Sequence, residues 1–255
     1  MTKLPEGFLQ APIAHRALHD AGRGRVENSR AAIEAAMASG YAIEMDLQLS
    51  RDHQAMVFHD YHLDRLTGET GPVLVRDAAE LTGIELGDGE DGIPTFAEAL
   101  ELVAGRVPLL IELKDQHGSL GVTNGALEQA VARALRRYTG PCAVMSFNPN
   151  MVAELARLLP DIPRGLVTSE FEGSYWAHLP EEVGLRLRDI PDAARVGASF
   201  ISHHAPDLGR ARVQELRAGG MPVFCWTIRS EAQELEARLM SDNITFEGYE
   251  AMLPA

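Results

Sequence analysis

The chain has 255 residues, a formal net charge of −14 at pH 7 and a hydrophobic fraction of 45%. This length suits a single α/β barrel, and the apolar fraction is ordinary for a protein with a sizeable core. The acidic balance argues against nucleic acid as the main partner and against stable association with an anionic membrane, because both depend on clustered Lys and Arg. If the substrate carries phosphate, the protein needs a local positive site, which a bound divalent cation would supply.

The cysteines and the N-terminal segment bear on location. Cys142 and Cys225 each lie in an apolar run, which favours buried, reduced thiols over a disulfide. The first residues lack the apolar stretch of a signal peptide, and no run approaches the length of a membrane span. We therefore expect a cytoplasmic protein without stable membrane association, while the sequence leaves its oligomeric state open.

Short apolar runs alternate with longer helical patterns through most of the chain. The predicted strands are Pro12–His15, Tyr41–Leu47, Ala55–His59, Val107–Leu113, Cys142–Phe147, Arg164–Thr168, Ala198–Ser202, Pro222–Trp226 and Asn243–Thr245. The predicted helices are Ser29–Ser39, Thr95–Ala104, Thr123–Tyr138, Pro149–Leu159, Pro180–Asp189, Asp207–Ala218 and Glu231–Met240. This alternation predicts a parallel sheet with right-handed crossovers, closed as a TIM-type (β/α)8 barrel. Either Asn28 or Ser29 can cap the first helix.

The pattern is irregular around the second and third strands. Only about seven residues, Gln48–Gln54, separate them, which is too few for a crossover helix. Nine strand-like runs instead of eight also imply that one strand is extra or broken. Residues 61–93 are rich in Gly, Asp and Thr, and they predict a short excursion that carries little core. Otherwise we expect one barrel domain that spans residues 1–255.

Residues with acid–base or metal-binding chemistry lie at four successive strand ends, where active sites of such barrels are found. They are His15 and Arg16, then Glu44 and Asp46, then His59, then Glu112 and Lys114. Side chains alternate across a strand with period two, so Glu44 and Asp46 share one face. Any one of these motifs alone would usually be a solvated edge or a structural ion pair. Three converging carboxylates would repel one another without a cation, and hard oxygen ligands suit Mg²⁺ or Ca²⁺.

This series of residues also resembles a known family. The motifs His15-Arg16, Glu27-Asn28, Glu44-x-Asp46, His59-Asp60 and Glu112-x-Lys114 resemble the glycerophosphodiester phosphodiesterase family. The run Cys225-Trp226-Thr227-Ile228 is similar to the aromatic strand near that family's C-terminus. The strongest resemblance covers residues 12–66, and a weaker one extends over nearly the whole chain.

The resemblance implies roles for individual residues. Glu44, Asp46 and Glu112 would hold one divalent cation, Mg²⁺ or Ca²⁺. His15 and His59 would be the general acid and base, and Arg16 and Lys114 would contact phosphate oxygens. The implied reaction converts a small glycerophosphodiester to glycerol 3-phosphate and an alcohol. The nucleophile is either water or the glycerol 2-hydroxyl, which would form a cyclic phosphate.

The chain departs from the family pattern at several positions. Ala17, Val26, Ser29, Arg229 and Phe246 replace the family's usual Gly, Pro, Thr, Asn and Asp. Arg229 and Phe246 follow late strands and could line the pocket. We expect Arg229 to favour anionic or strongly polar head groups over glycerophosphocholine; the alternative is a surface pair with a neighbour such as Glu231.

Three further residues are weaker candidates. His203 follows a predicted strand and could contact substrate, although a role in the loop is favoured. Trp226 is either core packing or an apolar wall for the glycerol or alcohol group. Asp60 is expected to orient His59 or its loop.

Other functions fit the residues less well. A related barrel phospholipase would need an apolar or basic loop to dock on lipid, and the sequence offers none. A metal-dependent amidohydrolase should carry His-x-His on its first strand, where this chain has His15-Arg16-Ala17. A barrel used only for binding would be expected to have lost some catalytic residues, and the core set is complete.

Overall fold

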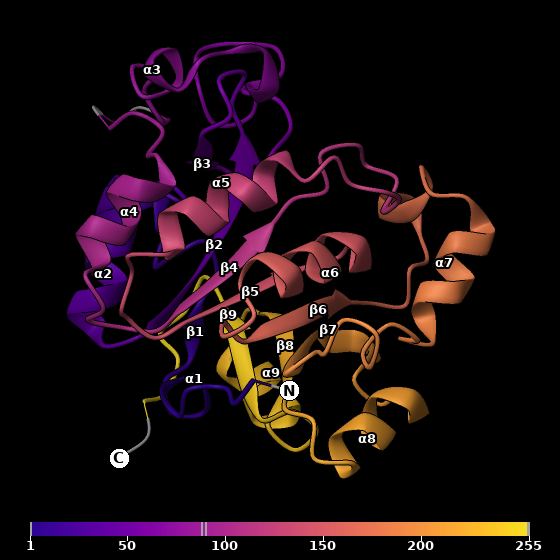
Figure 1. The fold of residues 1–255 in the computed structure, drawn as a ribbon. Coiled ribbons are helices and arrows are strands. Elements are labelled where there is room, and N and C mark those ends of the chain that lie inside the picture. The colour runs from indigo at the N-terminus through magenta and orange to yellow at the C-terminus, as the bar shows by residue number, and fades with distance from the viewer. Residues whose placement is uncertain (1, 88, 90, 254–255) are drawn as a thin grey trace.

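The computed structural model describes residues 2–87, 89 and 91–253 of the chain. Its strands are β1 (Ile13–Ala14), β2 (Ala42–Leu49), β3 (Ala55–Val57), β4 (Leu109–Leu113), β5 (Cys142–Ser146), β6 (Arg164–Thr168), β7 (Phe200–His204), β8 (Val223–Ile228) and β9 (Asn243–Phe246). Within the described residues they form one nine-stranded sheet, in which β1 pairs with both β9 and β2 and so closes a barrel (Figure 1). The predicted barrel is confirmed.

The extra strand explains the irregular start of the barrel. β3 is antiparallel and pairs with β2 from Leu47 to Leu49, whereas the other pairings of the described strands are parallel. Removing β3 from the nine described strands leaves eight in the closed barrel. The short connection before β3 is therefore a hairpin and not a crossover.

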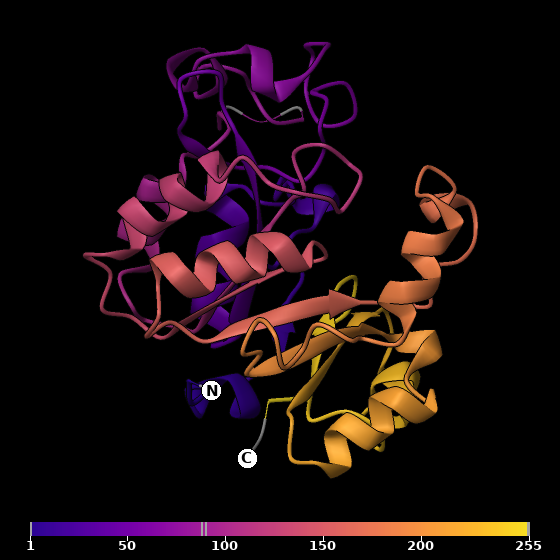
Figure 2. The ribbon, with the colours of Figure 1, turned by 45° about the vertical axis from the view of Figure 1, so that its right-hand side comes forward.

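The helices are α1 (Gly7–Gln10), α2 (Arg30–Ser39), α3 (Ala78–Leu81), α4 (Phe96–Val103), α5 (Ala126–Leu135), α6 (Pro149–Leu158), α7 (Glu181–Arg188), α8 (Ala211–Ala218) and α9 (Glu231–Ala237). Each predicted helix is present, with ends that differ by a few residues. Figures 1 and 2 show the longer helices outside the strands. Among the described residues, no helix has both the length and the apolar character needed to cross a membrane.

Local sequence signals set the start of α2. The Ser29 side chain accepts a hydrogen bond from the Ala32 N–H, so Ser29 is the cap. Asn28 instead donates from Nδ2 to Asp46 Oδ2 at 2.9 Å. The helix ends at Gly40, whose φ of 76° is the left-handed conformation that favours glycine. The two candidate caps therefore have separate tasks, one in the helix and one in the site.

The core has two layers. Ile43, Met45 and Leu47 of β2 pack outward in the cluster between strands and helices. Leu110 and Phe224 pack in the barrel interior with Phe8 of α1. Asn243 at the start of β9 donates hydrogen bonds to two carbonyl groups of the α1 region. α1 thus lies at the amino end of the barrel, which leaves the carboxyl end for the site.

Residues 61–93 form the predicted excursion, of which residues 88 and 90 lie outside the described residues. The segment contains α3 and extends away from the strands in both views (Figures 1 and 2). The expectation that it carries little core needs correction. Met56, Phe58, Leu63, Val73, Ala78, Leu81, Leu86 and Ile93 form a buried cluster of its own. Six of the eight come from separate positions within residues 61–93, whereas Met56 and Phe58 belong to β3 and the residue after it, so no single periodic run revealed the cluster.

Candidate active site

Three acidic side chains converge inside the mouth of the barrel. Ligand atoms of Glu44, Asp46 and Glu112 lie within 4.8 Å of one another. Asp46 on β2 stands opposite Glu112 on β4 in the strand register, and Glu44 is two residues before Asp46. All three are buried. The convergence predicted from the period of the strands is therefore confirmed.

Glu44 is the least compensated of the three. Its Oε1 is buried and has no hydrogen-bond partner among the described residues. Burial, together with the nearby charges of Asp46 and Glu112, raises the pKa of Glu44 well above its ordinary value. A divalent cation would give the unpartnered oxygen a ligand bond and would offset the repulsion among the three carboxylates. This oxygen-rich donor set fits a hard cation.

Lys114 is the principal positive group beside the carboxylates. Its Nζ lies 2.7 Å from Asp46 Oδ1 and 2.5 Å from Glu112 Oε1. Burial by itself lowers the pKa of Lys114, but these two carboxylates raise it above its ordinary value. Burial likewise opposes ionisation of Asp46, yet Lys114 and the other nearby positive groups hold its pKa well below the usual range. Asp46 is therefore fully ionised at neutral pH.

Arg16 lies on a strained turn after β1. Its backbone N–H donates to Glu44 Oε2 at 2.8 Å, and its Nη1 donates to Glu27 Oε1 at 2.7 Å. Arg16 and Ala17 have φ of 51° and 64°, a region that non-glycine residues rarely adopt. Ala17 thus keeps the backbone conformation that a glycine would adopt at that position without strain. The turn orients both the backbone and the side chain of Arg16 toward the carboxylates.

His15 has an acidic partner that the sequence interpretation missed. Its Nδ1 lies 2.5 Å from Oε2 of Glu247, the first residue after β9. Burial lowers the pKa of His15, and the contact with Glu247 opposes part of that shift. Burial opposes ionisation of the Glu247 carboxyl, but its hydrogen bond with His15 and its contact with His19 at 3.6 Å give it a lowered pKa. Its position at the end of a barrel strand was the available signal.

His59 has an equivalent arrangement. It follows β3, and its Nδ1 lies 2.6 Å from Asp60 Oδ1, the contact expected of Asp60. Arg65 Nε donates to Asp60 at 2.6 Å, and its Nη2 reaches Glu27 Oε1 at 2.8 Å. Since Glu27 also accepts from Arg16, a continuous polar network connects the two sides of the site.

A cavity of about 310 Å³ opens above these groups; we call it the barrel-mouth cavity. Its lining includes His15, Arg16, Glu44, His59, Glu112, Lys114, Trp226 and Arg229. Trp226 is fixed by donation from Nε1 to the Ser202 carbonyl at 3.0 Å, and its ring lies 4.9 Å from that of His204. The structure thus brings Trp226 to the cavity wall.

The structure does not bring two other residues to this cavity. His203 is fully buried on the outer face of β7, with Nδ1 2.8 Å from Thr168 Oγ1 and Nε2 3.1 Å from Asp207. Its neighbour His204 lines the cavity instead. Phe246 also points outward and packs against Tyr41 and Tyr249. Period two on a strand places alternate residues on opposite faces, which accounts for both corrections.

Arg229 lies on the rim of the barrel-mouth cavity, half exposed. Its Nη2 lies 2.7 Å and its Nε 2.8 Å from Glu247 Oε1. Its acidic partner is therefore Glu247, and not the Glu231 considered from the sequence. Arg229 and His15 bind the two oxygens of the same carboxylate.

Comparisons with known proteins agree with this geometry. The glycerophosphoryl diester phosphodiesterase family pattern matches residues 15–245. A glycerophosphodiester phosphodiesterase of Caldanaerobacter subterraneus is 28% identical over 251 residues, covering 94% of this chain and 95% of that protein. The solved structure of an Oleispira antarctica phosphodiesterase in complex with the product sn-glycerol-3-phosphate is 26% identical, with a TM-score of 0.75 and coverage of 94% of this chain and 93% of that one.

A second solved structure agrees in fold. The glycerophosphodiester phosphodiesterase of Agrobacterium tumefaciens superposes with a TM-score of 0.69 at 24% identity, and 96% of each chain is covered. The family match extends from the first catalytic candidate, His15, to Thr245 on the last strand. The chain belongs to the glycerophosphoryl diester phosphodiesterase family.

Proposed function

We propose that this protein hydrolyses glycerophosphodiesters to glycerol 3-phosphate and an alcohol at the barrel mouth, with histidine acid–base catalysis beside a divalent cation. The observation that carries the proposal is the buried cluster of Glu44, Asp46 and Glu112, of which Glu44 and Glu112 line one cavity with His15 and His59. Family membership and the product complex of the Oleispira antarctica relative support the substrate class.

The three carboxylates would hold the cation, either Mg²⁺ or Ca²⁺. When bound, it would supply positive charge to the phosphodiester oxygens. Arg16 and Lys114 contribute further positive charge that has no proton to lose near neutral pH. Both line the barrel-mouth cavity, so a phosphodiester beside the carboxylates would meet them there.

Each histidine is oriented by a carboxylate. Glu247 and Asp60 accept from the Nδ1 atoms of His15 and His59, so the Nε2 atom of each ring is available for proton transfer. In the proposed reaction, one Nε2 protonates the leaving alcohol while the other accepts the proton of the nucleophile. Water and the glycerol 2-hydroxyl are both compatible with this scheme. Trp226 and His204 form the wall against which we place the glycerol group.

The test is an assay of glycerol 3-phosphate release from a panel of glycerophosphodiesters, each with Mg²⁺, with Ca²⁺ and with chelator. We expect cation-dependent release from at least one diester. If no diester is cleaved with either cation, the proposed function is wrong.

Glu247 gives a prediction that tests the histidine scheme. We expect Glu247→Gln to lower kcat at least about tenfold, because His15 loses the carboxylate that fixes its orientation. Glu247 raises the pKa of His15, so its loss should also move the pH limb assigned to His15 toward lower pH. The measurement is the pH dependence of kcat and kcat/KM.

Glu231→Gln, which changes an exposed carboxylate at the start of α9, is the matched control. Unchanged kcat together with an unchanged pH profile in Glu247→Gln would contradict the role of Glu247. We also propose that Arg229 acts mainly by holding Glu247. Their ion pair offsets the arginine charge that was expected to select the head group.

A further inference from the structure

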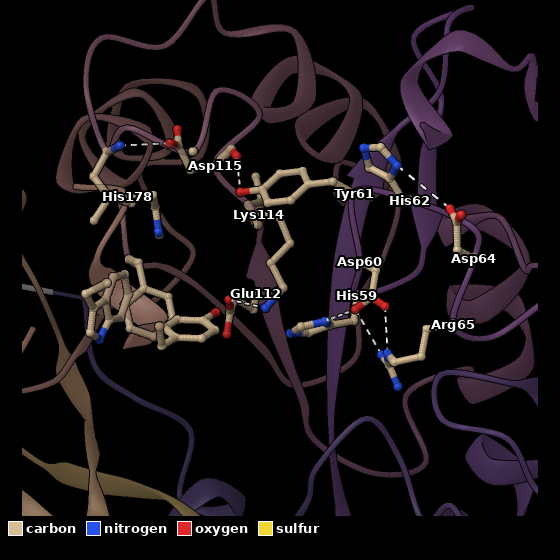
Figure 3. A pocket seen from close by; sticks show the side chains of 16 residues that line it. His59, Asp60, Tyr61, His62, Asp64, Arg65, Glu112, Lys114, Asp115 and His178 are labelled. Carbon is tan, nitrogen blue, oxygen red and sulfur yellow. Dashed lines mark hydrogen bonds and ion pairs between the residues drawn. The ribbon is translucent and has the colours of Figure 1, made fainter. Parts of the chain in front are cut away.

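A second cavity, of about 470 Å³, adjoins the candidate metal site; we call it the side cavity (Figure 3). It lies between residues 61–65, the loop after β4 and the loop after β6. It shares His59, Glu112, Lys114, Phe147, Tyr175 and Trp176 with the barrel-mouth cavity. A phosphodiester beside Glu112 would therefore have one cavity for each of its two substituents.

One wall of the side cavity is aromatic and apolar, while charged and histidine side chains line the rest (Figure 3). The Phe147 and Trp176 rings are 5.0 Å apart, and the Trp176 and Tyr175 rings are 4.8 Å apart. Leu120 and Tyr61 complete the wall on the other loops. Tyr61 and Tyr175 are 47% and 63% exposed, so large rings face solvent at the entrance. Clustered exposed apolar surface of this kind marks binding sites.

The acidic groups nearest the metal site are already paired. Glu112 contacts Lys114, and Asp60 accepts two hydrogen bonds from Arg65 (Figure 3). Asp115 is buried and accepts from the Leu120 N–H at 2.8 Å. A quaternary ammonium could contact these rings through cation–π interactions. The extent of the wall favours a longer apolar group, which would cover more of it than choline does.

The barrel-mouth cavity shares part of this aromatic wall and adds two hydroxyl groups. Ser202 Oγ and Thr245 Oγ1 line it, are buried, and have no hydrogen-bond partner among the described residues. Two free hydroxyl groups suit the hydroxyls of a glycerol moiety.

On the basis of the proposed function, we propose that the side cavity binds the leaving group, and that the preferred leaving group is an apolar alkyl or aryl alcohol. Its volume lies in the range of roughly 300–1,000 Å³ that is typical of ligand pockets. Ethanolamine or choline would fill only part of that volume. The glycerol phosphate half then occupies the barrel-mouth cavity.

The test is a series of sn-glycerol 3-phosphate diesters of ethanol, butanol and hexanol, with glycerophosphocholine as the charged comparison. Concentrations stay below aggregation, and the cation is the one that gives activity. Each methylene buried in an apolar site contributes enough to raise kcat/KM by about two- to fourfold. We expect the hexyl diester to exceed both the ethyl diester and glycerophosphocholine.

Two variants connect the preference to the side cavity. Leu120→Ala and Tyr61→Ala should each lower kcat/KM for the hexyl diester by more than for the ethyl diester. Leu4→Ala removes the same side chain as Leu120→Ala, from a buried position beside α1, and should keep the wild-type ratio. Tyr61 is half exposed, so its variant tests the proposal even if Leu120→Ala fails to fold.

The outcomes separate the two proposals. If the diesters are cleaved but kcat/KM does not rise with chain length, the apolar preference is overturned and the proposed function stands. If kcat/KM rises with chain length but neither Leu120→Ala nor Tyr61→Ala changes that rise, the assignment to the side cavity is overturned. If no diester is cleaved with any cation, the proposed function itself fails.

Discussion

Excess chelator is expected to reduce hydrolysis of any glycerophosphodiester to background, and added Mg²⁺ or Ca²⁺ to restore it. The reason is the cluster of Glu44, Asp46 and Glu112, whose ligand atoms lie within 4.8 Å of one another. Without a cation, Glu44 has a buried unpaired oxygen and Lys114 alone bridges the other two carboxylates. In that arrangement the positive groups beside the cluster, Arg16 and Lys114, are already paired with carboxylates, so a phosphate meets less positive charge than it would with the cation bound.

Asp46→Asn should weaken cation affinity at least about tenfold, since it removes one ligand charge and the contact with Lys114. Calorimetric titration of the cation measures this directly. The shift of Tm with added cation is a second readout, because a ligand that binds the folded state raises its stability. Asp161→Asn, at an exposed position, is the matched control. Full activity in excess chelator, or wild-type affinity in Asp46→Asn, would remove the metal hypothesis.

His15→Ala and His59→Ala are each expected to lower kcat by roughly 10²–10⁴, the usual contribution of a general acid or base. Burial lowers the pKa of His15, which favours the neutral ring that can accept a proton. Activity that depends on neutral His15 is lost as the pH falls through that lowered value.

Three measurements isolate this effect: single-turnover rates, cation affinity and Tm. Single-turnover rates should fall in both variants. Cation affinity should persist, because the three clustered side chains expected to hold the cation do not include either histidine. His117→Ala, at an exposed histidine, serves as the control. A wild-type kcat in either His15→Ala or His59→Ala would rule out the role assigned to that residue.

Much of the site follows from the sequence by one rule of strand geometry. Period two places Glu44 and Asp46 on the inner face, and the parallel register brings Glu112 opposite Asp46. The same rule would have pointed His204 inward and His203 outward. Extended two residues past the predicted end of the last strand at Thr245, it would have turned Phe246 outward and found Glu247 on the inner face. These errors concern residues just beyond the predicted ends of the strands, to which the alternation of inner and outer faces was not extended.

Other features had no usable signal in the sequence. The antiparallel pairing of β3 depends on contacts with β2 that the short connection allows but does not require. The cluster around Phe58 and Leu63 joins the β3 region to separate apolar residues of a turn-rich segment. The side cavity forms between three separate loops, and loop positions are not encoded by periodicity.

The closure of the barrel sets the order in which activity can appear during synthesis. β1 pairs with β9, and His15 contacts Glu247 across 232 positions of sequence. The three clustered carboxylates are all translated by residue 112, long before this partner. Until β9 docks, β1 and β8 each present an open edge that can pair with other chains. Such long-range pairing is slow to form. The three carboxylates therefore precede the acidic partner of His15 in the order of synthesis, and under the proposed function turnover would report that the last strand has joined the first.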